Sequence, residues 1–271
     1  MSKTLSEKPT IKRAYIDIPE GQIHYQIGGS GEPLLLLHQG MFSSDEFEKV
    51  MPLLAEDYLV IARDMLGYGI SDLNPPDFTM EDYARADMHF LQALGINRVD
   101  IVGIHTGAKI AIEIAATNPR IVSKMVLYEV FLRSAEEREA ARKSYTFSEI
   151  KIEEDGSHFI SRLWKAVRRF GPNASAEHLN KVVVAAAMAK GGAYHGEHAS
   201  FRHDTEKLLP LIKCPTLLIS GTGEFEHQQM EKVRGLIPNC QTKTIENVDA
   251  FVAMEKPTEF AEATLDFFKK S

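Results

Sequence analysis

The stretch Gly103-Ile104-His105-Thr106-Gly107 decides the fold of this chain. It follows a short apolar run at 98–102 that predicts a buried strand, and it opens the apolar helical pattern of residues 108–116. Two glycines four residues apart, between a strand and a helix, predict a turn so tight that a side chain at either glycine would collide with its surroundings. The central residue is then forced out over the end of the sheet, usually with strained dihedrals. We call residues 103–107 the elbow, and His105 is its central residue.

Length and composition predict a globular protein with one large α/β domain and a small lid. A net charge of -7 gives no reason to expect nucleic acid or a membrane as a partner, and no apolar run approaches the roughly 20 residues of a membrane span. Only Cys214 and Cys240 are present, which favours a reducing cytoplasm over a disulfide framework. We expect a monomer or homodimer that binds a small-molecule substrate without a cofactor or metal.

Apolar runs and turn residues alternate along most of the chain. Residues 12–18 and 22–28 predict an antiparallel hairpin around Pro19-Glu20-Gly21. Further strands are expected at 34–37, 58–62, 124–128, 215–220 and 241–245, and helices from Ser43 or Ser44 to about Ala55, from Thr79 to Leu94 and at 256–268. Strands that alternate with helices predict an α/β fold, with a mostly parallel twisted sheet and helices on both faces.

One block interrupts this alternation. Residues 132–208 contain no run typical of a buried strand and are charged and helical in places. We interpret this block as a helical cap inserted into a core formed by residues 12–131 and 209–271, and we refer to residues 132–208 as the cap. Residues 1–11 are expected to form a loose N-terminal tail.

Several motifs occur in an order that resembles the α/β-hydrolase superfamily, over roughly residues 12–270. In that family Leu37-His38-Gln39-Gly40 corresponds to the oxyanion loop, and residues 64–72 to an Asp-x-x-Gly-x-Gly-x-Ser turn. The elbow corresponds to the strand–turn–helix that presents the catalytic nucleophile. Residues 217–224 are similar to the late strand that often carries the catalytic acid, and Met254-Glu255-Lys256-Pro257 to the segment after the catalytic histidine. The resemblance implies the fold and leaves the chemistry open.

Two departures from the family pattern change the expected chemistry. The nucleophile position, normally Ser, Asp or Cys, is His105, and Ala250 falls where the family has its catalytic histidine. The resemblance therefore implies an enzyme without a Ser-His-Asp triad. The acid is ambiguous, because family members carry it at positions that correspond to Glu129 or to Glu224. Dehalogenase activity is not expected, since it needs an aspartate at position 105.

The expected site places His105 at its centre, as a general base or as a nucleophile, since an imidazole with a pKa near 6.5 suits proton transfer at neutral pH. Glu129 or Glu224 would orient it. The main-chain N–H groups of Gln39 and Thr106 would form the oxyanion hole.

Three further residues are candidates for substrate binding. His38 could bind substrate or hydrogen-bond its own loop, and Trp164 and His198 of the cap could line the pocket or pack the cap onto the core. The histidines at 195, 198 and 203 lack the acidic or cysteine partners of a recognised metal motif.

These residues predict a hydrolase for a small, mostly apolar carbonyl compound such as an ester, a lactone or a β-dicarbonyl. A lyase or cofactor-independent oxygenase that begins with proton abstraction by His105 is one alternative. The other is a non-catalytic pseudo-hydrolase that binds a small molecule. Ala250 favours that alternative, whereas the intact elbow glycines weigh against it.

Overall fold

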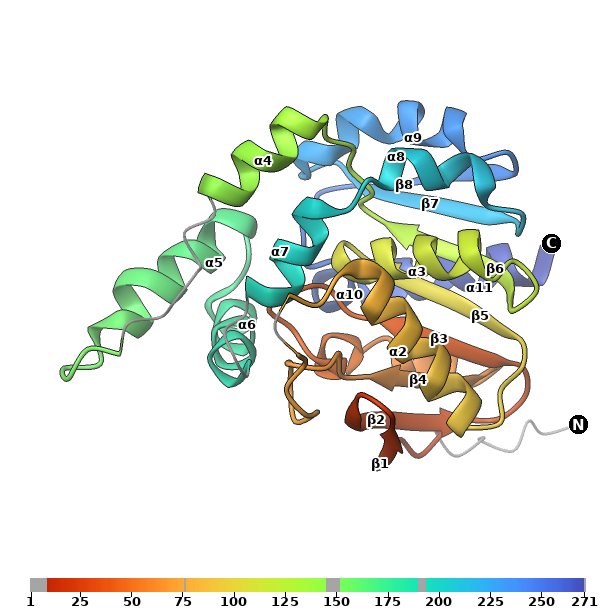
Figure 1. Ribbon diagram of the computed structural model, residues 1–271, viewed down its shortest axis with the longest axis horizontal. Helices are drawn as coiled ribbons and strands as arrows, with labels where there is room; N and C mark the ends of the chain where they lie inside the picture. The colour runs from red at the N-terminus through yellow and green to blue at the C-terminus, as the bar shows by residue number, and fades with distance from the viewer. Residues whose placement is uncertain (1–8, 76, 145–151, 190–193, 271) are drawn as a thin grey trace, which may run out of the picture.

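The computed structural model describes residues 9–75, 77–144, 152–189 and 194–270. That part contains an eight-stranded sheet in the order β1-β2-β4-β3-β5-β6-β7-β8 (Figure 1). The strands are β1 (Lys12–Ile18), β2 (Gly21–Gly29), β3 (Pro33–Leu37), β4 (Leu59–Arg63), β5 (Val99–Ile104), β6 (Val122–Tyr128), β7 (Thr216–Gly221) and β8 (Cys240–Ile245). The pairs β1·β2 and β2·β4 are antiparallel and all other pairs are parallel, which confirms the mostly parallel α/β fold.

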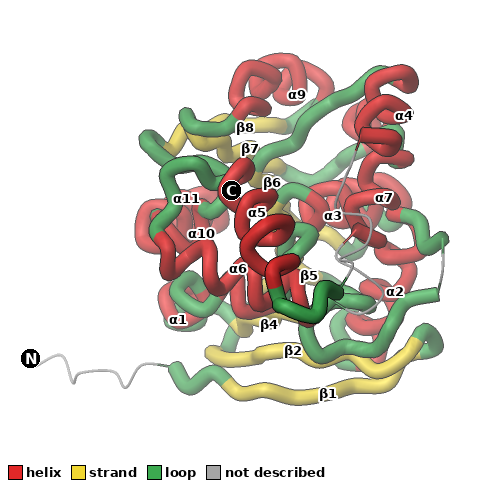
Figure 2. The backbone as a smooth tube through the Cα atoms, turned by 90° about the vertical axis from the view of Figure 1, so that its left-hand side faces the viewer, coloured by secondary structure: helices red, strands yellow, loops and turns green. Residues whose placement is uncertain are grey.

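Helices cover both faces of this sheet, as Figure 1 and Figure 2 show. The central strands alternate between two apolar clusters, so that Leu35 and Leu37 face one cluster and Leu34 and Leu36 face the other. This alternation explains the uninterrupted apolar run, because both faces of the strand are buried. The first face is covered by α2 (Met80–Ala93), α3 (Thr106–Thr117) and α9 (Met230–Leu236), and the second by α1 (Met51–Leu54), α10 (Val252–Glu255) and α11 (Pro257–Lys270).

The helix expected from Ser43 or Ser44 to Ala55 is wrong as a single element. The structure has a 3₁₀ turn, η1 (Ser44–Phe47), followed by the short helix α1. Pro52 in the first turn of α1 explains the break, since proline lacks an N–H and its ring clashes with the carbonyl four residues earlier. The start is as expected, because the Ser43 side chain accepts the N–H of Asp45.

Between β6 and β7, the described residues form helices and connecting segments. These are α4 (Ala135–Ser144), the π-helix η2 (Phe159–Trp164), α5 (Lys165–Phe170), α6 (Ala176–Met188), α7 (Tyr194–Arg202), α8 (Thr205–Leu208) and the 3₁₀ turn η3 (Leu209–Leu211). In Figure 1, α4, α5 and α6 lie beyond one end of the sheet, whereas α7 lies close to α3. A third apolar cluster joins α5, α6 and η2 of the cap to Met41, Phe42 and Phe251 of the core.

Within the described ranges, no helix is both long and apolar enough to cross a membrane.

Candidate functional site

The elbow has the geometry that its two glycines predict. β5 ends at Ile104, α3 begins at Thr106, and His105 between them has φ 46° and ψ -105°, a conformation that L-residues rarely adopt. A Cβ on Gly103 would lie 2.6 Å from the carbonyl oxygen of Gly107, and a Cβ on Gly107 would collide with the Leu37 carbonyl of β3. The strained backbone of His105 is therefore held in place by close contacts on both sides.

His105 lies against the carboxyl of Glu224, which follows β7, the second strand along from β5 in the sheet. His105 Nε2 lies 3.4 Å from Glu224 Oε1, and the side chains of the two residues are 16% and 9% exposed. Glu224 follows β7 and precedes the 3₁₀ turn η4 (Phe225–Gln229). The edge of the Tyr128 ring packs against the imidazole, at 6.1 Å between ring centres. A distance of 3.4 Å is longer than an ordinary hydrogen bond, but such contacts are often loose in the absence of substrate.

The second candidate acid, Glu129, has a different environment. It follows β6 with a positive φ of 53°, and its Oε1 accepts the main-chain N–H of Gly221 at 2.7 Å. Burial raises the pKa of the Glu129 carboxyl to about 8, and the charge of Glu224 adds to the increase. A carboxyl with that pKa is mostly protonated at neutral pH. Of the two candidates, Glu224 is therefore the one whose carboxylate lies against His105.

The structure places the main-chain N–H of Gln39 away from a substrate. It donates to Glu46 Oε2 at 3.0 Å, and the Gln39 side-chain nitrogen donates to Glu46 Oε1 at 2.6 Å and to the Ala250 carbonyl at 2.9 Å. With this bond in place, the N–H of Gln39 is not available to an oxyanion. This arrangement argues against the oxyanion-hole role expected for Gln39, because its N–H already donates to the buried carboxyl of Glu46.

Glu46 was not identified from the sequence, where it reads only as an acidic residue in the first turn of a helix. It is 2% exposed, and burial raises the pKa of its carboxyl to about 7, against the opposing effect of its hydrogen bonds from Gln39. Its position depends on the packing of η1 under the oxyanion loop, for which the sequence has no local signal.

His38 belongs to the loop itself. Its Nε2 accepts the Met65 N–H at 2.9 Å, so Nδ1 carries the proton and donates to the Gln39 carbonyl at 2.7 Å. The residue is fully buried, and burial lowers the pKa of its imidazole to about 4. Because both ring nitrogens are used within the core, the geometry disagrees with a substrate-binding role and fits the alternative of a loop-stabilising residue.

Thr106, the first residue of α3, contacts the cap. Its hydroxyl donates to Glu197 Oε1 of α7 at 3.1 Å. Its main-chain N–H belongs to the first turn of α3, where helical amides have no partner within the helix. The same Glu197 oxygen lies directly against Gly40, where a Cβ would collide with it. Glu197 was not identified from the sequence, because only the packing of α7 on α3 brings it to the elbow.

The two cap candidates lie at different places. His198 follows Glu197 on α7, where it is half-buried, and burial lowers the pKa of its imidazole, with the cations of Arg142 and Arg202 adding to the effect. Trp164 ends η2 and packs against the apolar cluster that includes Phe42 and Phe251. Trp164 thus lies on the cap side of the oxyanion loop.

The turn before α10 carries Ala250 at the position where the family has a histidine. Ala250 and Asp249 are buried, and the Asp249 carbonyl accepts the Tyr128 hydroxyl at 2.7 Å. Burial, together with the charges of Glu255 and Glu224, raises the pKa of the Asp249 carboxyl to about 6. Residue 250 has no group that could transfer a proton, and the titratable side chains around the elbow are His105 and the surrounding carboxyls.

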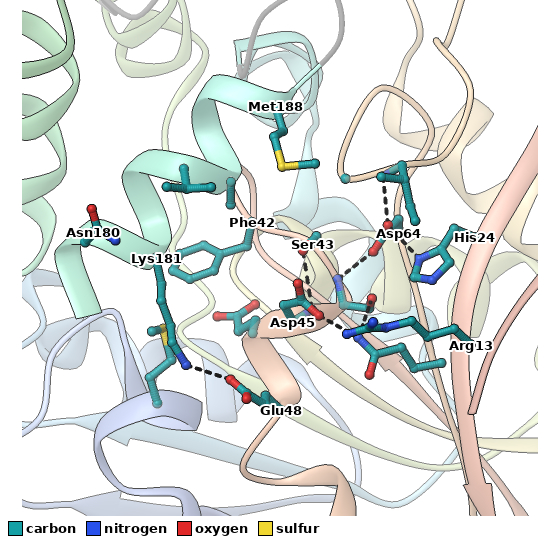
Figure 3. A pocket seen from close by; sticks show the side chains of 18 residues that line it. Arg13, His24, Phe42, Ser43, Asp45, Glu48, Asp64, Asn180, Lys181 and Met188 are labelled. Carbon is teal, nitrogen blue, oxygen red and sulfur yellow. Dashed lines mark hydrogen bonds and ion pairs between the residues drawn. The ribbon is translucent and has the colours of Figure 1, made fainter. Parts of the chain in front are cut away.

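A cavity of about 520 Å³ lies between α6 and η1 (Figure 3), and its lining does not include residues 103–107 of the elbow. Figure 3 shows His24 paired with Asp64 on one side, at 2.9 Å, and the ion pair of Lys181 with Glu48 on the other, at 2.6 Å. Glu46 also lines this cavity, so it connects the cavity to the oxyanion loop. Among the residues that the structure describes, no group of three or more His, Cys, Asp or Glu side chains could hold a metal ion.

Comparisons with known proteins agree with this architecture. A family model described as "alpha/beta hydrolase fold" matches residues 32–257. The soluble epoxide hydrolase of a Corynebacterium species is 24% identical over 269 residues, which cover 91% of this chain and 93% of that protein. The 2-hydroxy-6-oxo-6-(2'-aminophenyl)hexa-2,4-dienoic acid hydrolase of Metapseudomonas resinovorans is 25% identical over 280 residues, which cover 98% of this chain and 93% of that protein.

A solved structure and a shorter match add to these relatives. The thermophilic esterase from Thermogutta terrifontis has a TM-score of 0.81 at 23% identity, over 96% of this chain and 98% of that one. An uncharacterized protein of Mycobacterium bovis is 36% identical over 103 residues, which span 38% of this chain and only 30% of that protein. Because the family match spans well over half of the chain and includes the elbow, this chain belongs to the α/β-hydrolase family.

Proposed function

We propose that this chain is an α/β-hydrolase that cleaves a small, mostly apolar carbonyl compound, such as an ester, a lactone or a β-dicarbonyl, with His105 as general base. The observation that carries the proposal is the contact of His105 Nε2 with Glu224 Oε1 at 3.4 Å. A carboxylate on one imidazole nitrogen fixes the tautomer and stabilises the imidazolium that forms when the other nitrogen takes a proton. The base thus stands on the elbow, paired with an acid from the end of β7.

The proposed reaction needs no side-chain nucleophile. His105 Nδ1 takes a proton from a water molecule, the water oxygen bonds to the carbonyl carbon, and the π electrons of the carbonyl move onto its oxygen. When this oxyanion collapses, the bond to the leaving group breaks, and the leaving alkoxide of an ester or a lactone, or the leaving enolate of a β-dicarbonyl, takes the proton back from His105. One water is consumed, and the products are an acid with an alcohol, or an acid with a ketone for a β-dicarbonyl. The Thr106 N–H at the start of α3 supports the oxyanion, since helix N-termini favour negative charge.

Two observations support the substrate class. The buried cluster that includes Phe42 and Phe251, with Trp164 packed against it, places apolar side chains beside the oxyanion loop. The hydrolase of Metapseudomonas resinovorans acts, by its name, on a compound with an oxo group, and it matches nearly the whole of this chain. Both fit a carbonyl substrate with apolar substituents.

Substitution of the base tests the proposal. We expect wild-type protein to hydrolyse at least one of 4-nitrophenyl butyrate, ethyl butyrate and a γ-lactone, and His105→Gln to lose on the order of 10²-fold or more in kcat. His89→Gln is the matched control, because His89, on α2, is also paired with a carboxylate, that of Glu20. Retention of wild-type kcat by His105→Gln would contradict the proposal, and tight binding of a probe without turnover would favour the pseudo-hydrolase.

The pair of His105 and Glu224 also favours one alternative reaction. A histidine at position 105, in place of the family's hydroxyl or thiol nucleophile, is also suited to abstract a proton next to a carbonyl, as a lyase or cofactor-independent oxygenase requires. Acetylacetone in D₂O separates the two reactions. Exchange of its α-protons and uptake of oxygen, without release of acetate, would favour proton abstraction over hydrolysis.

A further inference from the structure

One carboxyl at the elbow has no part in the reaction derived so far. Glu197, on cap helix α7, lies between the two segments that normally surround the substrate oxygen in this fold. Its Oε1 is 3.1 Å from the hydroxyl of Thr106, the residue after the base, and it lies against Gly40 of the oxyanion loop. A Cβ on Gly40 would collide with the Glu197 carboxyl, so the carboxyl lies directly against the backbone of the loop. The carboxyl therefore lies between the start of α3 and the oxyanion loop, where it could contact a carbonyl oxygen bound beside His105.

The oxyanion loop lacks the donor that this position normally supplies. The Gln39 N–H is held by Glu46 Oε2 at 3.0 Å, and Glu46 is fixed by a second bond, of 2.6 Å, from the Gln39 side chain. Of the two main-chain donors expected for an oxyanion, Thr106 alone remains in place. A reaction that builds charge on a carbonyl oxygen would then lack a donor, and the loss of one such donor typically costs 10²- to 10³-fold in rate.

We propose that the Glu197 carboxyl takes the place of the Gln39 N–H and donates a hydrogen bond to the carbonyl oxygen of the substrate. Glu197 would thus be a catalytic residue contributed by the cap. The proposal rests on the proposed hydrolytic function, since it assigns a second residue to the same reaction.

The surroundings of Glu197 support a carboxyl that carries its proton. Burial raises its pKa, and this effect outweighs the hydrogen bond from Thr106 and the charges of His105, Lys109 and Arg133, which act in the opposite direction. A carboxylic acid kept neutral by its environment donates a strong hydrogen bond to a developing oxyanion, as in ketosteroid isomerase. His105 and Glu197 would then be the base and the acid of one site.

The cap holds this carboxyl firmly enough for such a role. The N–H of Gly196 donates to the Tyr68 hydroxyl at 2.9 Å, and Lys109 Nζ donates to the Ser200 carbonyl at 2.9 Å. These bonds join α7 to the core on both sides of Glu197. A donor that is already in position at the moment of reaction needs no reorganisation, which is the condition under which an oxyanion donor is effective.

Two substitutions at Glu197 test the proposal, with 4-nitrophenyl butyrate and ethyl butyrate as probes. We expect Glu197→Ala to lower kcat by 10²- to 10³-fold on both esters, because an oxyanion donor acts on the carbonyl oxygen and not on the leaving group. Glu197→Gln keeps a weaker N–H donor, so we expect it to recover part of the rate. Glu177→Gln, at an exposed cap position in the first turn of α6, is the matched control and should keep the wild-type kcat.

The pH profile provides a readout that a purely structural role would not change. Wild-type kcat should fall as the pH rises through the raised pKa of Glu197, since the protonated form is the donor, and this alkaline limb should be absent from Glu197→Gln. Wild-type kcat in a folded Glu197→Ala variant, a loss confined to ethyl butyrate, or an alkaline limb retained in Glu197→Gln would each overturn the proposal. These results are distinguishable from failure of the proposed function, which would appear as full activity in His105→Gln.

Discussion

At the scale of single residues, the candidate site is distinguished by the position of its histidine. The imidazole stands on the elbow at His105, and the turn before α10 has Ala250. Glu224, which follows β7 two strands away in the sheet, lies against the imidazole. The acid therefore still pairs with a histidine, although the histidine has a different place in the chain.

The pairing of Glu224 with His105 leads to a kinetic prediction. Glu224→Gln keeps the shape of the side chain but removes the charge that stabilises the imidazolium, so we expect kcat on 4-nitrophenyl butyrate to fall by about 10²-fold or more. Glu231→Gln on α9, where the side chain is 72% exposed, should leave kcat unchanged. Steady-state kinetics measure kcat for the two variants. Equal kcat values in both would show that Glu224 has no role in the reaction.

The close contacts of the elbow lead to a prediction about stability. Gly107→Ala places a methyl group against the Leu37 carbonyl of β3, and we expect a loss of about 1–3 kcal/mol in the free energy of unfolding. Gly235→Ala in α9 meets open space and should be neutral or stabilising by up to about 1 kcal/mol. Urea unfolding measures both. Equal stabilities of the two variants would show that the turn relaxes around the added methyl group.

At the scale of secondary-structure elements, local sequence signals succeed where the determinants are adjacent in the chain. The N-cap of α2 is an example, because Thr79 and Asp82 form a reciprocal capping box. The Asp82 N–H donates to the Thr79 hydroxyl, and the Thr79 N–H donates to the Asp82 carboxylate. The expected start at Thr79 is confirmed. The expected helix up to Ala55 was wrong, because Pro52 interrupts it.

The capping box leads to a third prediction. Thr79→Ala removes the side-chain acceptor for the N–H of Asp82 and leaves that donor unpaired within the helix, so we expect a loss of about 0.5–2 kcal/mol in the free energy of unfolding. Thr258→Ala, at an exposed position inside α11, is the control. Thermal unfolding of both variants provides the comparison. An equal loss of stability in the two would mean that the capping box of α2 contributes nothing to stability.

At the scale of the whole molecule, the site gathers buried carboxyls from distant parts of the chain. Glu46 follows β3, Glu129 follows β6, and Glu197 comes from the cap, and burial is the largest cause of the raised pKa of each. Their proximity to His105 lowers these pKa values in part but does not restore them to the ordinary range. The folded protein therefore holds protons near neutral pH that the unfolded chain releases.

This proton retention leads to a prediction about stability and pH. Between about pH 5 and about pH 8 Glu46 and Glu129 hold more protons in the folded state than in the unfolded state, because their pKa values are about 7 and about 8 when folded and near 4.5 when unfolded. The free energy of unfolding should then fall as the pH rises through this range, by at most about 1.4 kcal/mol per pH unit for each group.

Glu129→Gln tests this effect, because the amide oxygen can still accept the Gly221 N–H but cannot ionise. We expect its melting temperature to decline less with pH than that of the wild type. Glu231→Gln should follow the wild-type curve. Melting temperatures that change with pH in the same way for the wild type and Glu129→Gln between about pH 5 and about pH 8 would contradict the assignment of the Glu129 proton.

The sequence alone determined the features that depend on neighbouring residues. The spacing of Gly103 and Gly107 predicted the elbow, the uninterrupted apolar run at 34–37 predicted a strand buried on both faces, and Thr79 predicted the start of α2. Each follows from steric limits or periodicity within about ten residues of chain. The motifs shared with the family then predicted the order of the strands and helices along the chain.

Only the tertiary structure decided which groups share the site. Glu224 and His105 are distant in sequence and meet because β5, β6 and β7 are adjacent and parallel, which brings their carboxyl ends to one edge of the sheet. The packing of η1 on the core buries Glu46 and brings it within hydrogen-bond distance of the Gln39 N–H. The packing of α7 on the core places Glu197 against Gly40. A carboxyl's pKa depends on the water it loses and on the charges around it, and both follow from packing between distant segments rather than from residue order.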